Sequence, residues 1–504
     1  MDANTVYAGN LFTPDGWRAD AQLRIEDGRI AALATSARAT DAPTARLILP
    51  GMPNLHSHAF QRAMAGLAER SGDSVEACGR GSPLADSRDR GRSQKVDSFW
   101  TWRETMYAFA SRIAPGDLRA IAAQLYVEML KAGYTHVCEF HYLHHAPNGK
   151  PYPDPAEMSL AIIEAAREAG IGLTLLPVLY MSGGFDGRPL SERQRRFGTD
   201  VESYLRLLER ARALESPMLR VGIALHSLRA VPEAAMREVL GWASSQASIG
   251  GAASSRHPAS SPVAAHDAIQ GIAQAQQLRP IHIHVAEQLV EVEECLALRG
   301  ARPVQWLLDH AEVNANWCLV HATHLDANEI RTLAASGAVA GLCPTTEANL
   351  GDGLFPLANF MEARGTLGIG SDSHISVSPV EELRWLEYGQ RLVAHQRNIA
   401  ARAAGVSVAE TLWKAALHGG AQASGLAPFG IGARADLLVL DEQSPSLAAR
   451  DERNALDSFV FAGNTPLVRD VMVNGEWVVR DFRHRGEAAI AERYRHVVKQ
   501  LAPA

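Results

Sequence analysis

Cysteine is scarce in this chain of 504 residues and is scattered along it. No two cysteines are spaced as Cys-x-x-Cys; the five are Cys78, Cys138, Cys295, Cys318 and Cys343. The pattern therefore disfavours both a disulfide framework and a thiolate zinc site. A reducing cytoplasm is the location that this cysteine usage predicts.

Long apolar runs and an excess of positive charge are missing as well. No run approaches the roughly 18 apolar residues of a membrane-spanning helix, and the first residues lack the basic and apolar regions of a signal peptide. Basic residues number 49 against 56 acidic residues, which gives a formal net charge of −7. With no basic run and no fixed-period repeat, we expect a small-molecule partner rather than nucleic acid or membrane.

The middle of the chain alternates short apolar runs with helical patterns. Helical patterns lie, for example, at 117–131, 155–169 and 201–214. Strands that alternate with helices pair in parallel, and eight such units predict a (β/α)8 TIM-like barrel with its active site at the C-terminal strand ends. The eight runs are the stretch before His56 and residues 135–142, 172–180, 219–228, 280–285, 317–325, 338–343 and 367–371.

Both ends of the chain have β patterns. Hairpin signals occur at Asp27-Gly28 and at Asn474-Gly475, and residues 435–440 form a further apolar run. We therefore predict three parts. They are a composite β-sandwich domain at 1–49 and 425–484, the barrel domain at 50–424, and an amphipathic C-terminal helix within 485–504.

Two segments resemble insertions. Residues 71–95 are rich in Gly, Ser, Arg and Asp, and residues 244–267 are low in complexity. Neither segment can bury much apolar surface, so both are expected to be loops.

A His-x-His motif follows the first apolar run. Residues 47–49 are expected to form a buried strand whose continuation is interrupted by Pro50 and Pro53. In extended backbone, residues two apart point to the same side, so His56 and His58 can hold one metal ion. Neutral imidazole suits zinc, iron or nickel.

A second motif closes the run at 280–285. His284 is a candidate metal ligand and Glu287, after a bend, a candidate proton carrier. His282 would lie one layer deeper, where a hydrogen-bonded core histidine is the favoured interpretation.

Two later strand ends also carry polar side chains. His321 closes one run, and Asp372 follows another between glycine and serine; His324 stands in a loop and is equally consistent with ordinary surface. A solvated turn is the simplest reading of Asp372 alone, but together the motifs place three histidines and an aspartate around one ion. Catalytic zinc keeps a position open for water, so the motifs predict metal-assisted hydrolysis.

These motifs, in this order, resemble the amidohydrolase superfamily over nearly the whole chain. Binuclear members carry a lysine at the end of the fourth strand, and this sequence has none there. In this respect the sequence is similar to the mononuclear deaminase branch. The resemblance rests on Pro-Gly-Met-Pro-Asn-Leu-His-Ser-His at 50–58, His-Val-Ala-Glu at 284–287, Leu-Val-His-Ala-Thr-His at 319–324, Gly-Ser-Asp-Ser at 370–373 and Ala-Arg-Ala-Asp-Leu-Leu-Val-Leu at 433–440.

Within that branch, residues 54–67, 98–104, 139–145 and 226–231 resemble the formimidoylglutamate deiminase family. The resemblance implies hydrolysis of N-formimino-L-glutamate to N-formyl-L-glutamate and ammonia in histidine degradation, by a homodimer. The insertions at 71–95 and 244–267 depart from the family pattern.

The resemblance also implies site residues. It places one zinc ion per chain on His56, His58, His284 and Asp372. It assigns proton handling to Glu287, His321 and Asp372. It assigns substrate binding to Gln61, Arg103, Tyr142, His226 and Arg229. The chemistry of arginine agrees with this assignment. The planar guanidinium group binds carboxylates in a bidentate manner, and N-formimino-L-glutamate has two carboxylates.

Other functions stay open at this point. Imidazolonepropionase, or a deaminase of a purine or triazine ring, would share the barrel and the metal, and a ring substrate predicts an apolar, aromatic pocket. A non-catalytic scaffold predicts a lost metal ligand, and none is missing. A sensor that binds an acidic metabolite without turnover would keep the whole site.

Overall fold

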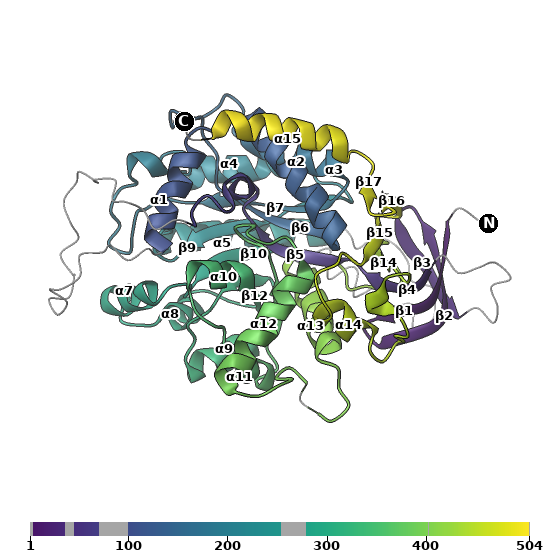
Figure 1. The fold of residues 1–504 in the computed structure, drawn as a ribbon. Helices are drawn as coiled ribbons and strands as arrows, with labels where there is room; N and C mark the ends of the chain where they lie inside the picture. Colours follow the sequence, from purple (N-terminus) through teal and green to yellow (C-terminus); the bar gives the residue numbers. More distant parts are fainter. Residues whose placement is uncertain (1–3, 36–44, 70–98, 254–278, 402, 503–504) are drawn as a thin grey trace.

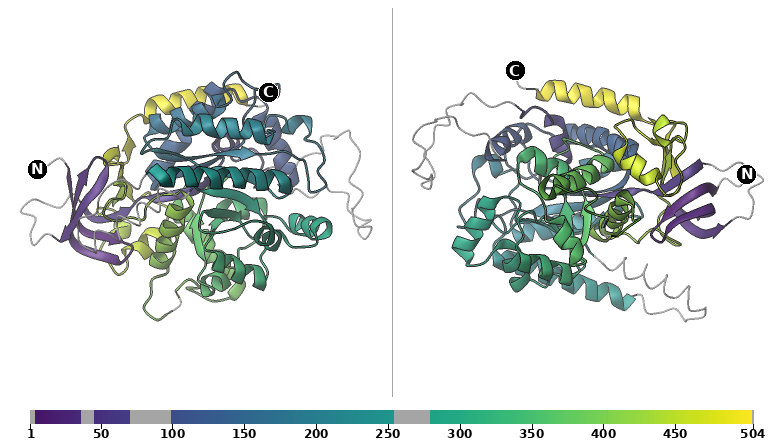
Figure 2. Two further views of the ribbon diagram at one scale, coloured as in Figure 1. Left: turned by 180° about the vertical axis from the view of Figure 1, so that it is seen from behind. Right: turned by 60° about the horizontal axis from the view of Figure 1, so that its bottom comes forward.

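The computed structural model describes residues 4–35, 45–69, 99–253, 279–401 and 403–502. A parallel barrel is surrounded by helices, and a smaller sheet is built from strands near both ends of the chain, as Figure 1 and Figure 2 show. The predicted fold class is thereby confirmed.

The barrel strands neighbour one another in chain order, and every pair is parallel. The fourth position of the barrel is occupied by two short strands separated by Gly222. A Cβ atom at this residue would lie 2.7 Å from the carbonyl oxygen of Pro280, so the close approach of the two backbones requires glycine. The strands are β5 (Met52–Ser57), β6 (Tyr134–His141), β7 (Gly172–Leu179), β8 (Leu219–Val221), β9 (Ile223–Ser227), β10 (Ile281–Val285), β11 (Trp317–His321), β12 (Val339–Leu342) and β13 (Thr366–Ile369).

The barrel closes where the end of β5 meets the residues after β13. The amide of Asp372 donates a hydrogen bond to the carbonyl of His56 at 3.0 Å, and the amide of His58 donates to the carbonyl of Asp372 at 3.1 Å. Closure therefore brings the two ends of the barrel sequence, with three predicted metal ligands, to one place.

Helices cover the barrel, and the predicted helical patterns at 117–131, 155–169 and 201–214 correspond to α2, α3 and α4. The helices are α1 (Phe99–Ala110), α2 (Pro115–Ala132), α3 (Glu157–Ala169), α4 (Val201–Arg212), α5 (Glu233–Ala253), α7 (Leu289–Arg299), α8 (Pro303–His310), α9 (Ala327–Ser336), α10 (Pro344–Leu350), α11 (Leu357–Glu362), α12 (Pro379–Ala394), α13 (Val408–Ala423), α14 (Ala455–Phe461) and α15 (Glu487–Leu501). Short 3-10 turns lie at η1 (Ala59–Met64), η2 (Glu192–Gln194) and η3 (Pro445–Leu447).

The strands of the barrel are buried on both faces. Every residue of β6 and β7 is buried, as expected for parallel strands covered by helices. One continuous apolar core includes Tyr126 of α2, Trp317 of β11 and Trp413 of α13. This packing holds the strand ends, and the side chains on them, in fixed positions.

The apolar run before His56 divides into two strands. Residues 47–49 belong to β4 (Ala45–Pro50) of the small sheet, within the predicted β segment 1–49, whereas β5, which contains Pro53, is the first barrel strand. The chain changes sheets at Gly51, whose amide donates to the carbonyl of Asp436 at 3.0 Å. Pro53 is tolerated because the register with β6 shifts between Met52 and Pro53.

The small sheet combines both ends of the chain. Its order is β17-β16-β15-β14-β4-β1-β2-β3. The apolar side chains of β1, β2, β4 and β14 enclose a separate core. Its strands are β1 (Thr5–Thr13), β2 (Gly16–Glu26), β3 (Arg29–Thr35), β4, β14 (Leu437–Leu440), β15 (Val468–Val473), β16 (Glu476–Arg480) and β17 (Arg483–His484).

Both predicted hairpins are present. Asp27-Gly28 joins β2 to β3 and Asn474-Gly475 joins β15 to β16, with positive φ at all four residues. The predicted C-terminal helix is α15, which lies beside α2 (Figure 1), where Lys131 and Glu487 form an ion pair at 2.7 Å.

One predicted loop is partly helical. Residues 244–253 continue α5, while 254–267 and the whole of the predicted loop 71–95 lie outside the described residues. Alanine and serine allow the helix to continue where the low complexity of the sequence suggested a loop.

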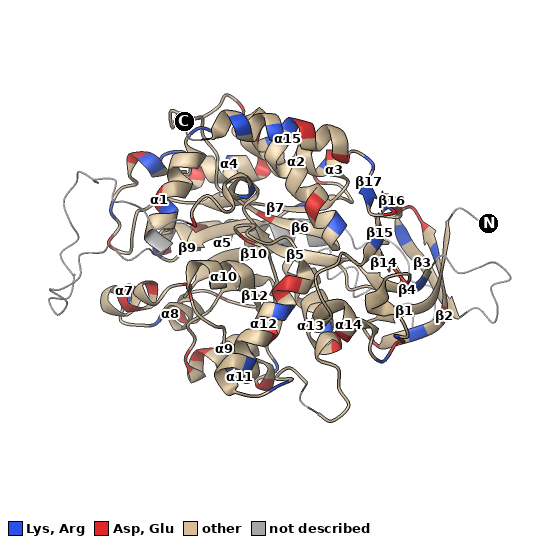
Figure 3. Cartoon of the chain, in the orientation of Figure 1, with Lys and Arg blue, Asp and Glu red and all other residues tan. Residues whose placement is uncertain are grey.

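Figure 3 shows Lys and Arg interspersed with Asp and Glu along the helices. Among the helices in the described part of the chain, none has the length and apolar character needed to cross a membrane.

We predict that Gly419→Ala lowers the unfolding midpoint. A Cβ atom there would lie 2.0 Å from the carbonyl oxygen of Leu367 in β13, and neither backbone can move without disturbing the barrel. Overpacking of this kind costs about 1–3 kcal/mol. The control is Gly241→Ala in α5, which meets nothing within 4 Å and should leave stability unchanged or raise it. Equal urea midpoints for Gly419→Ala and wild type would contradict the prediction.

Candidate metal centre and adjoining cavity

The predicted site residues meet at the C-terminal ends of the barrel strands. His56 lies on β5, His284 on β10 and His321 on β11, and Asp372 follows β13. All are buried. This end of a (β/α)8 barrel is where catalytic side chains are found.

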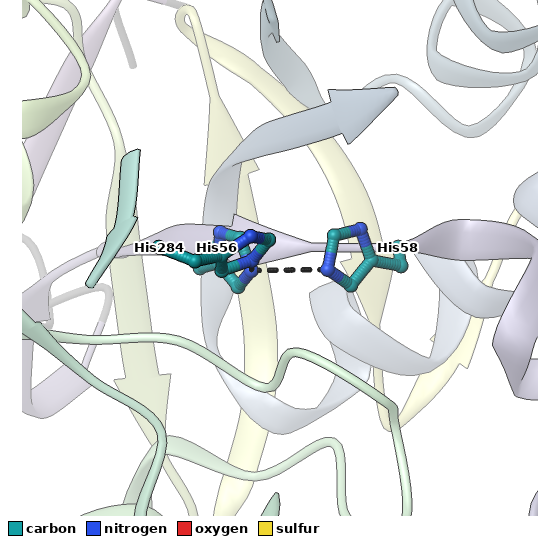
Figure 4. A group of neighbouring side chains, drawn as sticks. All are labelled: His56, His58 and His284. Atoms are coloured by element: carbon teal, nitrogen blue, oxygen red, sulfur yellow. Dashed lines mark hydrogen bonds between the residues drawn. The ribbon is translucent and has the colours of Figure 1, made fainter. Parts of the chain in front are cut away.

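Three imidazole rings converge on one point, as Figure 4 shows. The Nε2 atom of His56 lies 3.2 Å from Nε2 of His58 and 3.0 Å from Nε2 of His284. The Oδ1 atom of Asp372 lies 3.5 Å from Nε2 of His56 and 3.2 Å from Nε2 of His58. The fold therefore brings together the four side chains that the sequence indicated as candidate metal ligands.

The orientation of two rings shows what these nitrogens can bind. Nδ1 of His58 donates to the carbonyl of Phe140 at 2.9 Å, and Nδ1 of His284 donates to the carbonyl of His226 at 3.0 Å. A neutral ring with its proton on Nδ1 presents a lone pair on Nε2. Both lone pairs face Nε2 of His56, so three ring nitrogens crowd one point, an arrangement that a shared cation would stabilise.

Protons do not serve as that cation. Burial lowers the pKa of His56 to about 3 and lowers the pKa of His58 and of His284 as well. Three neutral imidazoles and one carboxylate are the nitrogen and oxygen donors that zinc accepts, so the residues fit a metal ion.

Asp372 completes this donor set as an anion. Burial raises its pKa, but the hydrogen bond with His56 and the nearby histidine rings outweigh burial and hold the pKa below its usual range. Its φ of 48° is in the left-handed region, as are the φ of 70° at His321 and of 53° at Ala286. Strained backbone of this kind is concentrated at functional sites.

Glu287 and His321 lie beside the metal ligands. Nε2 of His321 is 3.7 Å from Oε1 of Glu287 and 4.0 Å from Oδ2 of Asp372. Burial raises the pKa of Glu287, which favours proton uptake by this carboxyl group compared with an exposed glutamate. Burial lowers the pKa of His321, but the carboxylates of Glu287 and Glu347 outweigh it and raise the pKa to about 10.

Glu347 is a site residue that the sequence analysis missed. It lies on α10, and its Oε1 accepts from Nδ1 of His321 at 3.3 Å and from the amide of Cys343 at 2.8 Å. The carboxylate therefore fixes the ring of His321 with Nε2 toward Asp372. The sequence signal that could have indicated Glu347 is its position four residues after the end of the apolar run 338–343.

Two other histidines lie outside this cluster. Nε2 of His282 is 2.8 Å from the carbonyl oxygen of Ala423, one layer deeper in the barrel, as the core interpretation predicted. His324 is half-buried in the loop after β11 and does not line the cavity described next.

A cavity adjoins the metal centre and contains all five predicted substrate-binding residues. Its wall also includes His58, His284, Glu287, His321 and Asp372. The five are Gln61, Arg103, Tyr142, His226 and Arg229.

Gln61 and Tyr142 form one side of this cavity. Nε2 of Gln61 donates to the hydroxyl of Tyr142 at 2.8 Å, and Oε1 of Gln61 is buried without a hydrogen-bond partner among the described residues. Arg229 is buried on another side, and its Nε atom is likewise without such a partner. Unsatisfied buried polar atoms that line a cavity are available to a ligand.

Arg103 is held by two tyrosines that the sequence analysis did not single out. Its Nε donates to the hydroxyl of Tyr107, and its Nη2 donates to the hydroxyl of Tyr180 at 3.3 Å. Gln194 of η2 bridges them, donating to Tyr180 at 2.8 Å and to Tyr107 at 3.4 Å. The guanidinium group is thus fixed in the cavity wall. Tyr180 closes the predicted apolar run 172–180, which was its only sequence signal.

The chain belongs to the amidohydrolase family, whose model matches residues 47–478. It is 48% identical over 503 residues to formimidoylglutamate deiminase of Pseudomonas aeruginosa, covering 99% of each chain. It is 25% identical over 491 residues to 5-methylthioadenosine/S-adenosylhomocysteine deaminase of Natronomonas pharaonis, covering 95% of this chain and 93% of that protein.

Solved structures agree with this family. An amidohydrolase from Brucella melitensis has a TM-score of 0.83 and 39% identity, with 99% of each chain covered. A zinc-bound adenosine deaminase from Xanthomonas campestris has a TM-score of 0.72 at 19% identity, covering 99% of this chain and 98% of that one, and shares the fold.

We predict that His284→Asn lowers the zinc content well below that of the wild-type protein, because the substitution removes one of three converging nitrogen donors. The matched control is His282→Asn, two residues earlier on the same strand, whose ring contacts Ala423 instead. Zinc is measured by mass spectrometry on folded, desalted protein. Equal zinc loss in both variants, or full retention by His284→Asn, would contradict the assignment.

Proposed function

We propose that this chain is a zinc-dependent hydrolase that converts N-formimino-L-glutamate into N-formyl-L-glutamate and ammonia. The observation that carries the proposal is that one cavity joins the His56–Asp372 metal centre and Glu287 to two arginines, Arg103 and Arg229. The similarity to the Pseudomonas aeruginosa deiminase supports it.

The four predicted ligands would hold the zinc ion. A zinc ion bound by His56, His58, His284 and Asp372 would supply Lewis-acid activation of water at neutral pH. Glu347 keeps Nε2 of His321 turned toward Asp372, so that the ring can stabilise charge next to the reacting carbon.

Glu287 moves the protons. As the oxygen of a water molecule bonds to the formimino carbon, Glu287 accepts a proton from that water. Glu287 then delivers this proton to the terminal nitrogen. The second proton of the water, on the oxygen now bonded to carbon, passes to the same nitrogen through Glu287 or Asp372. The bond between this nitrogen and the carbon then breaks, and ammonia leaves. The oxygen of the water remains as the formyl oxygen, and the bond between carbon and the glutamate nitrogen survives.

The cavity wall favours an acyclic dianion over a ring. Arg103 and Arg229 bring two guanidinium groups for the two carboxylates of the substrate. Gln61 and Tyr142 add amide and hydroxyl groups beside the formimino end. A ring deaminase would need an apolar, aromatic wall in the place of the arginines.

We also propose the finer features that the family implies. They are one zinc ion per chain, a place in histidine degradation, a cytoplasmic location and a homodimer. Trp385, Tyr388 and Leu392 support the homodimer, because they form an exposed apolar stripe on α12. We propose that residues 1–49 and 425–484 fold as one domain beside the catalytic domain at 50–424.

We predict that the zinc-loaded protein releases ammonia and N-formyl-L-glutamate in equal amounts from N-formimino-L-glutamate. Glu287→Gln should lower kcat by roughly 10²–10⁴, while zinc stays bound. Ammonia release and product mass are measured together. Formamide with free glutamate would show cleavage of the other bond, and absence of turnover at one zinc per chain would refute the proposed reaction.

The tyrosine contacts of Arg103 generate a second prediction. Tyr180→Phe removes one hydrogen bond to the guanidinium group, worth about 0.5–1.5 kcal/mol, so KM should rise about two- to tenfold while kcat changes little. The matched control is Tyr204→Phe, whose buried hydroxyl bonds to the carbonyl of Pro177, away from the cavity. An unchanged KM for Tyr180→Phe, or an equal rise in both variants, would show that the contact does not position Arg103.

A further inference from the structure

A second cavity lies at the opposite end of the barrel, between the N-terminal strand ends and the small sheet. Its volume is about 720 Å³, within the range of small-molecule sites. It shares no lining residue with the cavity at the metal centre. Its wall combines the starts of β6 and β7, residues 215–221, part of α13 and the segment that leads into β14.

Positive charge is concentrated on this wall, although the whole chain is acidic. Among the described lining residues, five cationic side chains face two carboxylates, Glu215 and Asp436. The cationic residues are Arg29, Arg220, Arg279, Lys414 and Arg434. A wall of this kind attracts anions.

One carboxylate of the wall, Asp436, is already hydrogen-bonded within the protein. Asp436 receives two hydrogen bonds from Nε of Arg434, at 2.9 and 3.0 Å, and one from the amide of Asn474 at 2.9 Å. Lys414 lies 3.9 Å from Glu410, which is not part of the wall. These pairs neutralise Arg434 and Lys414 locally.

Two arginines, Arg220 and Arg279, lie near the other carboxylate of the wall, Glu215. Arg29 donates to the carbonyl of Gly432 at 2.9 Å. Glu215 lies 3.9 Å from Nη1 of Arg279 and also accepts from the amide of Val221 at 2.9 Å. Burial lowers the pKa of Arg220, Glu215 raises it, and the charges of Arg279, Arg29 and Arg434 lower it further. Because Arg29, Arg220 and Arg279 line the same cavity, a bound anion would offset the repulsion between their charges.

The rest of the wall is apolar. Leu417 of α13, Met218, and Pro428 and Phe429 before β14 line it together with Thr135. The hydroxyl of Thr135 is buried without a hydrogen-bond partner among the described residues. The cavity thus offers a polar, cationic side and an apolar side to one molecule.

We propose that this cavity is a binding site for a small organic anion that carries at least two negative charges, as carboxylates or phosphates, on an apolar body. Arg29, Arg220 and Arg279 bind the charged groups, and Leu417 and Phe429 contact the body. The site is separate from the reaction and does not depend on which substrate is hydrolysed. Because residues of both sheets line it, an occupied site links the small sheet to the barrel.

The test uses the full-length, zinc-loaded protein with three probes: pyrophosphate, citrate and 2-naphthyl phosphate. Binding is measured by calorimetry and by the shift of the unfolding midpoint at constant ionic strength. At least one probe should bind saturably and raise the midpoint, since a ligand of the folded state alone stabilises it. Tighter binding of the phosphates or of citrate identifies the preferred charged group.

Variants assign the binding to this cavity. The double variant Arg220→Gln, Arg279→Gln should bind at least tenfold more weakly. The control Arg24→Gln changes an exposed arginine of the small sheet that does not line the cavity, and it should bind as wild type does. Arg103→Gln should also bind normally, which excludes the catalytic cavity. If the double variant does not fold, the exposed Arg29→Glu takes its place and should weaken binding at least threefold.

Any one of four results would overturn the proposal. Three of them are the absence of saturable binding for all three probes, unchanged affinity in the folded double variant or in the Arg29→Glu variant that replaces it, and loss of binding in Arg103→Gln. A loss of midpoint shift that also occurs in Arg24→Gln would show general electrostatic binding only and would overturn it as well.

Discussion

The closure of the barrel is the constraint on which the metal centre depends. Two backbone hydrogen bonds join residue 372 to residues 56 and 58, so the same contacts that complete the barrel set the spacing of three donor side chains. Backbone contacts at a barrel seam are far more rigid than contacts between side chains. The convergence of lone pairs on one point therefore follows from the architecture and not from local flexibility.

Burial then determines the chemical state of these side chains. The core around the strands keeps water out, which keeps the imidazoles of His56, His58 and His284 neutral and raises the pKa of Glu287. Asp372 remains an anion because histidine rings surround it. One environment thus provides neutral nitrogen donors, an anionic donor and a carboxyl group that can exchange protons.

The two ends of the barrel differ in composition for a structural reason. At the C-terminal end, loops of different strands bring carboxylates, imidazoles and arginines into one cavity. At the N-terminal end, the chain passes between sheets at Gly51, and the segment before β14 covers the strand starts. Arginines suit the place where the small sheet meets the barrel. Their aliphatic side-chain atoms can be buried in apolar surroundings while the guanidinium groups face a cavity.

Sequence pattern alone determined the alternation of strands and helices, both hairpins and the strand ends that carry His56, His58 and His284, because these depend on local periodicity and on residues two or three apart. It did not predict a strand at 52–57, because Pro53 there indicated an interruption rather than the first barrel strand. It also missed Glu347, Tyr107 and Gln194. Glu347 and Gln194 act through contacts with His321 and with the two tyrosines, which only the tertiary structure brings together, whereas Tyr107 lies one helical turn from Arg103 on α1.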